Sequence, residues 1–192
     1  MTRAFSALPE EPGERSSMSR NREEAGLAAL EALLQEVDGC SAQLDELHVG
    51  RLQCRLGCKA CCVDEITVFD LEAANIRRHH DSLLASESPH PPGACAFLDE
   101  AGACRIYAQR PYVCRTQGLP LRWLDEGSDG EPVELRDICP LNEAGPPLEQ
   151  LPQEHCWSIG EFEGRLAELQ RSTSGGSLRR VALRALFRRP GA

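Results

Sequence analysis

Several features that mark common protein classes are scarce in this chain of 192 residues. Aromatic residues make up only 5% of it, so we expect a modest apolar core for its length. No apolar run approaches the roughly 18 residues that a membrane-spanning helix needs. The first residues place Pro9 and Pro12 among acidic side chains and lack the apolar stretch of a secretory signal. We therefore expect a cytoplasmic protein without a transmembrane segment.

Positive charge is also in deficit, because 30 acidic residues outnumber 21 Lys and Arg and give a formal net charge of -9. Nucleic-acid binding needs a clustered positive surface, so we expect no nucleic-acid partner. A nucleotide-binding glycine loop, an HExxH motif and a Ser-His-Asp arrangement are all missing from the sequence. Those enzyme classes therefore have no support, and whether the chain is an enzyme of another kind stays open.

Cysteine, by contrast, is abundant, with ten residues in the chain. Thiolates are strong ligands for zinc, iron and iron–sulfur clusters, and a reducing cytoplasm keeps thiols free of disulfides. The pattern therefore predicts metal binding rather than a disulfide framework. The candidate ligands form one group before residue 63 and a second, wider group after it: Cys54, Cys58, Cys61, Cys62, Cys95, Cys104, Cys114 and Cys139.

The adjacent pair Cys61 and Cys62 restricts how an ion can be bound. Successive side chains point apart on a strand or a helix, so we do not expect both to be equivalent ligands of one mononuclear ion. Either the pair serves two neighbouring centres, or one ligates while the other packs as a small apolar residue. The candidates outnumber the ligands of one four-coordinate ion, which favours two mononuclear sites or one multinuclear cluster. Gly57 suits a turn with positive φ around such a site.

Basic residues flank the cysteines and could offset the negative charge of a thiolate site. They are Arg55, Lys59, Arg105, Arg110 and Arg115. The simpler interpretation of Arg110 is an ion pair with a carboxylate, while Pro111 starts a helical turn. Tyr107 either donates to a ligating sulfur or fills core space.

The remaining cysteines and the histidines lie outside this pattern. We interpret Cys40 as a packing residue, because isolated cysteines are usually buried. Cys156 could be a ligand or a core residue, since His155 and Trp157 flank it. His79 and His80 fall within a predicted helix, where we expect them to be solvated.

Hydrophobic periodicity predicts an α-rich α+β fold. Apolar residues at steps of three and four predict an amphipathic helix over residues 21–52, and a second helix follows from Thr67 as N-cap to before Ser86. Short strands are predicted at residues 97–98 and 104–107, with a hairpin over residues 119–135. The expected fold is a small cysteine-rich domain nucleated by metal, with short β hairpins and flanking helices.

Three regions are expected along the chain: a disordered leader over residues 1–20, a cysteine-cluster metal-binding domain with N- and C-terminal helices over residues 21–170, and a flexible linker with a basic C-terminal helix over residues 171–192. The last of these carries five arginines and no acid after residue 177. It either contacts an acidic partner or membrane surface, or docks on its own domain. Docking through Leu183, Leu186 and Phe187 is the simpler interpretation.

These cysteines, together with residues 104–115, resemble the YkgJ-type or CxxCxxCC family of cysteine-cluster proteins, described as chelating zinc or iron. The residues that carry the resemblance over roughly residues 50–140 are Cys54, Cys58, Cys61, Cys62, Cys95, Cys104, Tyr107, Arg110, Pro111, Cys114, Arg115 and Cys139. Three residues separate Cys54 from Cys58, where the family's nickname implies two. The resemblance implies bound zinc or iron, with an iron–sulfur cluster as an alternative, and no generally assigned reaction. Flagellin lysine N-methylases are similar in their cysteine cluster.

Three classes of function follow. The first is a metal-binding protein whose ion is structural or is carried to others, and it predicts colourless protein with bound zinc. The second is an iron–sulfur redox protein or protein-modifying enzyme, which would be brown. The third is a thiol redox switch, which predicts reversible loss of free thiols without metal.

We predict that Cys61→Ser, and separately Cys104→Ser, lowers both bound metal and folded yield, because each removes a ligating sulfur. Elemental analysis of the purified variants measures the first quantity and soluble yield the second. Full metal occupancy in both variants would contradict their assignment as ligands.

Overall fold

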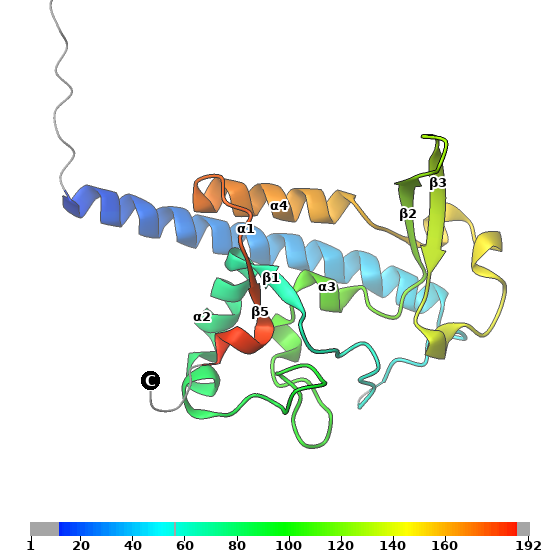
Figure 1. Ribbon diagram of the computed structural model, residues 1–192, viewed down its shortest axis with the longest axis horizontal. Coiled ribbons are helices and arrows are strands. Elements are labelled where there is room, and N and C mark those ends of the chain that lie inside the picture. Colours follow the sequence, from blue (N-terminus) through cyan, green and yellow to red (C-terminus); the bar gives the residue numbers. More distant parts are fainter. Residues whose placement is uncertain (1–11, 56, 188–192) are drawn as a thin grey trace, which may run out of the picture.

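The computed structural model describes residues 12–55 and 57–187, and helices dominate it (Figure 1). The four helices of this part are α1 (Pro12–Leu47), α2 (Asp70–Ser86), α3 (Tyr112–Arg115) and α4 (Glu161–Ser174). Its strands are β1 (Thr67–Phe69), β2 (Leu121–Glu126), β3 (Pro132–Asp137), β4 (Trp157–Ser158) and β5 (Arg180–Ala182). With about 47% helix and 13% strand, the predicted α-rich α+β class is confirmed. None of these helices combines the length and apolar character that crossing a bilayer requires.

Helix α1 is the longest element, and α4, α2 and α3 contact it, with α4 packed along its length (Figure 1). Its apolar stripe is buried as the periodicity predicts, at Leu27, Leu30, Leu33, Leu34, Val37 and Leu44. The helix begins at Pro12, so residues 12–20 are helical where we expected a disordered leader, and residues 1–11 lie outside the described part. It ends at Leu47, before a turn over residues 48–51, rather than at residue 52.

Two apolar clusters form the core of the described residues. The first lies between α1, α4 and the starts of α2 and α3, and it includes Tyr112, Trp157 and Phe162. The second joins α2 to the segment that begins at Cys95 and to the C-terminal segment. In it the ring centroids of Phe97 and Phe187 lie 5.0 Å apart. Apolar burial therefore organises the observed core, and the expected metal-nucleated core is not seen among these residues.

The start of α2 differs from the prediction. Thr67 is not an N-cap but belongs to β1, which pairs with β5 in antiparallel register, Thr67 facing Ala182. The helix begins at Asp70, and Glu72 accepts hydrogen bonds from the backbone N–H of Phe69 at 3.0 Å and of Tyr112 at 2.9 Å. One buried carboxylate thereby satisfies amide groups at the starts of both α2 and α3.

The predicted hairpin is confirmed as β2 and β3, and β4 adds to it in parallel to give the order β3-β2-β4. The strands predicted at residues 97–98 and 104–107 reduce to a single bridge between Leu98 and Cys104. Residues Tyr107–Gln109 form a 3-10 turn instead. Pro111 precedes the first turn of α3, as expected.

The C-terminal segment is not the predicted basic helix over the part that the structure describes. Gly175 and Gly176 end α4 with positive φ, and β5 is followed by a 3-10 turn, Leu183–Leu186. Leu183, Leu186 and Phe187 are buried in the second apolar cluster. Residues 188–192, with the last two arginines, lie outside the described residues.

We predict that Glu72→Ala lowers the free energy of unfolding by about 2–4 kcal/mol, because it leaves two buried backbone N–H groups without an acceptor. Urea unfolding measures this loss. The matched control is Glu168→Ala, which removes an exposed carboxylate paired with Arg171 in α4 and should cost less than about 0.5 kcal/mol. Equal losses in the two variants would contradict the role given to Glu72.

Candidate metal centre

The first cysteine segment winds through two successive tight turns. The N–H of Cys58 donates to the carbonyl of Arg55 at 2.9 Å, and the N–H of Cys62 donates to the carbonyl of Lys59 at 3.0 Å. Gly57 has a φ of +85°, as the sequence predicted for a turn at this position. The turns place the four cysteines of this segment within the long loop between α1 and β1, over residues 48–66.

The second cysteine segment is fastened directly to the first. The N–H of Cys95 donates to the carbonyl of Cys62 at 2.9 Å. Arg184, from the C-terminal segment, donates to both oxygens of Asp64 at 2.9 Å and to the carbonyl of Ala94 at 2.9 Å. Asp64 also accepts the N–H of Gly93 at 3.0 Å. One guanidinium thus bridges the residues just after Cys62 and just before Cys95.

Five cysteines near this junction shift one another's pKa values, and we call Cys61, Cys62, Cys95, Cys104 and Cys114 the inner group. Burial raises the pKa of Cys114 to about 12, and the negative charges of Cys95 and Cys104 add to the shift. Burial also raises the pKa of Cys104, with Arg110 and Arg105 acting in the opposite direction. These thiols therefore act on one another, and the raised pKa values keep Cys104 and Cys114 protonated at neutral pH in the metal-free protein.

The adjacent pair in the inner group behaves differently from the expectation. The thiols of Cys61 and Cys62 hydrogen-bond to each other, which lowers the pKa of Cys61 and raises that of Cys62. The two sulfurs are therefore close together, and whether both bind one ion stays a prediction. The sequence-based argument assumed a strand or a helix, whereas Cys61 and Cys62 lie in a turn.

The remaining three candidates, Cys54, Cys58 and Cys139, form what we call the outer group. Burial raises the pKa of Cys54, a hydrogen bond from Asn142 lowers it, and the charges of Cys58, Cys139 and, from the inner group, Cys61 raise it, so the two groups lie close to each other. A cavity of about 410 Å³ adjoins this group and is lined by Gln53, Arg55, Gly57, Cys58 and Leu141. Cys54 is exposed and Cys58 lines this cavity, whereas Cys95 is buried in the second apolar cluster and Cys62 and Cys104 pack against it.

The two groups supply thiol donors suited to a metal ion, but these thiols are not arranged around a common point. All eight predicted ligands carry thiols, which are the donors that zinc and iron prefer. Among residues 12–55 and 57–187, no three side chains of His, Cys, Asp or Glu are placed to hold one metal ion. The donor set fits a thiophilic ion in chemistry, and ligation requires the thiols to turn toward a common point.

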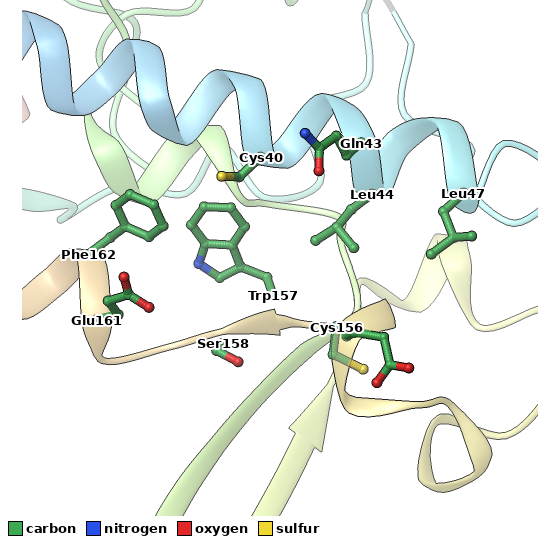
Figure 2. A pocket seen from close by; sticks show the side chains of 10 residues that line it. Cys40, Gln43, Leu44, Leu47, Cys156, Trp157, Ser158, Glu161 and Phe162 are labelled. Carbon is green, nitrogen blue, oxygen red and sulfur yellow. The ribbon is translucent and has the colours of Figure 1, made fainter.

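Cys40 and Cys156 lie apart from both groups. They line a separate pocket of about 360 Å³, where Figure 2 shows Cys40 beside Trp157 and Cys156 on the chain leading into β4. Cys40 packs against the first apolar cluster, as predicted. Cys156 is buried, and its sulfur lies 3.9 Å from a guanidinium nitrogen of Arg136. The carbonyl of neighbouring His155 accepts a hydrogen bond from His48 at 2.7 Å.

The basic and aromatic residues predicted to lie beside the cysteines mostly contact other protein side chains. Arg110 lies 4.0 Å from Asp38 and stacks over the ring of Tyr107, so the expected carboxylate pair is present. Arg115 pairs with the same Asp38 and is buried. Tyr107 is 66% exposed and therefore does not fill the core.

The histidines predicted to be solvated also have ordinary partners. The ring of His79, which is exposed, lies 3.4 Å from Glu31. The ring of His80, which is half-buried, lies 2.9 Å from the side-chain oxygen of Gln109. Both contacts are polar and join α2 to distant parts of the chain, so neither histidine needs a metal to explain its place.

Sequence reasoning missed four residues that position the cysteines. Asp64 and Arg184 join the two segments, while Asn142 and Gly118 contact Cys54. Asn142 lies one 3-10 turn after Cys139, and this closeness to a candidate ligand is the one sequence feature that could have pointed to it. No sequence pattern marks Arg184, because its partners lie about 90 to 120 positions earlier in the chain.

Comparison with known proteins identifies one family. Residues 53–140 match the family model CxxCxxCC, described as "Putative zinc- or iron-chelating domain". The range agrees with the residues on which the resemblance rests, and the resemblance is confirmed. No curated protein and no solved structure matches the chain.

We predict that the affinity of the metal-free protein for Zn²⁺ rises with pH between about 6 and 9, by up to about tenfold per pH unit for each thiol that must ionise. The pKa values of Cys95, Cys104 and Cys114 are raised, so protons compete with the metal throughout this range. Competition with a chelator at several pH values measures the affinity. An affinity that stays constant over this range would contradict thiol ligation.

Proposed function

Since residues 53–140 match the CxxCxxCC family of zinc- or iron-chelating domains, we propose that the inner group, Cys61, Cys62, Cys95, Cys104 and Cys114, is the principal metal site of this chain. The outer group of Cys54, Cys58 and Cys139 supplies a second set of thiols beside it. On this proposal the ion is zinc or iron, bound through sulfur alone.

The observation that carries the proposal is the junction between the two cysteine segments. Cys62 and Cys95 are held by a backbone hydrogen bond, and Arg184 ties Asp64 to Ala94 on either side of it. Such a fixed junction lowers the entropy that must be lost when thiols from distant parts of the chain meet on one ion. It supports a single site built from both segments.

The number of thiols favours more than one ion. Five thiols in the inner group exceed the four that a mononuclear tetrahedral site takes, which supports either a multinuclear iron–sulfur centre or a second ion shared with the outer group. All ten cysteines are free thiols, which supports residence in a reducing compartment such as the cytoplasm. The ion is structural or carried to other proteins in the simplest form of the proposal.

Protein purified without oxygen tests the proposal through elemental analysis and an absorption spectrum. We expect stoichiometric zinc in colourless protein, or iron with a sulfur-to-iron charge-transfer band. Cys114→Ser should weaken metal affinity by about tenfold or more, because it removes a buried thiol of the inner group. The matched control is Cys40→Ser, which changes a half-buried cysteine that packs against the first apolar cluster and should keep the wild-type metal content.

Two outcomes would refute the proposal. Wild-type protein that takes up neither zinc nor iron would remove metal binding altogether. Equal metal content in the Cys114→Ser and Cys40→Ser variants would remove the inner group as the site.

A further inference from the structure

Asn142 is a fully buried polar residue directly beside the outer group. It closes the 3-10 turn Pro140–Asn142, and its backbone N–H donates to the carbonyl of Cys139 at 2.7 Å. Its side chain makes three further contacts. The oxygen accepts the N–H of Gln53 at 2.8 Å, and the nitrogen donates to the carbonyl of Gly118 at 2.8 Å and to the sulfur of Cys54 at 3.5 Å.

The orientation of this amide follows from its partners. The backbone N–H of Gln53 can only donate, so the atom that faces it must be the amide oxygen. The carbonyl of Gly118 can only accept, so the atom that faces it must be the NH₂ group. The second N–H of that group is left for the Cys54 sulfur, and no alternative orientation satisfies all three neighbours.

Gly118 completes a slot for the same sulfur. Its φ is +96°, and a Cβ built on it would lie 2.5 Å from the Cys54 sulfur and 3.3 Å from the Asn142 amide nitrogen. A side chain at this position would displace the sulfur, because such a separation is far below van der Waals contact. The thiol of Cys54 thus lies against one glycine and one amide, although Cys54 as a whole is exposed.

We propose that Asn142 is a positioning residue for Cys54, and that it aims the Cys54 sulfur toward a thiophilic metal ion shared with Cys139. This inference rests on the proposed metal-binding function and extends it to the outer group. The side chain of Asn142 holds Cys54 while its backbone holds Cys139, so one residue sets the relation between two thiols 85 positions apart in the sequence.

The hydrogen bond also has a chemical consequence for the bound sulfur. An N–H that points at sulfur stabilises the thiolate more than the neutral thiol, and the thiolate is the form that binds metal. Outer hydrogen bonds of this kind hold ligands in place, and their loss typically costs about 10- to 100-fold in metal affinity.

A double-mutant cycle with Zn²⁺ and Co²⁺ tests the inference. We expect Asn142→Leu to weaken Zn²⁺ binding by about tenfold or more and to change the thiolate-to-cobalt charge-transfer band. The same substitution in a Cys54→Ala background should cause little further loss, because the sulfur through which it acts is gone. A general packing defect would instead lower affinity equally in both backgrounds.

Gly118→Ala gives a second variant that leaves the Asn142 amide intact. The added methyl group should push the Cys54 sulfur out of its slot and reduce the charge-transfer band. Its matched control is Gly130→Ala in the turn between β2 and β3, where φ is +82° and no atom lies within 4 Å of the added carbon. The control carries similar backbone strain without the contact with sulfur.

The outcomes separate this inference from the proposed function. Wild-type protein that binds neither Zn²⁺ nor Co²⁺ would remove the proposed function and the inference with it. Wild-type protein that binds metal while Asn142→Leu and Gly118→Ala keep its affinity and spectrum would overturn the role of Asn142 alone. An equal loss for Asn142→Leu with and without Cys54 would also overturn it. Should Asn142→Leu fail to fold, the comparison of Gly118→Ala with Gly130→Ala decides.

Discussion

Arg184 forms a bidentate ion pair with Asp64, and this pair links the parts of the chain that carry the thiols. Asp64 follows the first cysteine segment by two residues, and the same guanidinium reaches the carbonyl of Ala94, next to Cys95. This pairing and the hydrogen bond from Cys95 to Cys62 hold the two segments together, alongside their packing in the second apolar cluster. The C-terminal segment therefore contacts and stabilises the cysteine-rich region, even though it lies outside residues 53–140.

Burial beside the second apolar cluster has opposite effects on the thiols with and without metal. A buried thiolate is costly, and so the pKa values of Cys95, Cys104 and Cys114 are raised when no cation is present. A bound cation would reverse that cost, since its charge stabilises the ionised sulfur. Burial of apolar side chains in the two clusters stabilises the fold beside any contribution from a bound ion.

Inner and outer groups differ in access and in support. The inner thiols border the apolar cluster and lie near the charges of Arg105 and Arg110. The outer thiols adjoin an open cavity and depend on one buried amide, Asn142, for the placement of Cys54.

The sequence alone determined the class of fold, the apolar face of α1, the β2–β3 hairpin and the turn at Gly57, because each depends on residues close together in the chain. The eight cysteines stay predicted ligands. It misplaced the start of α2 and the form of the C-terminal segment, since β1 and β5 are strands only by pairing across more than a hundred residues. Tertiary structure decided which cysteines lie near one another, including the contact between Cys61 and Cys62. It also decided the contacts of Asn142 and Arg184. Spacing in a sequence tells which sulfurs are available, whereas packing and long-range hydrogen bonds determine which of them meet.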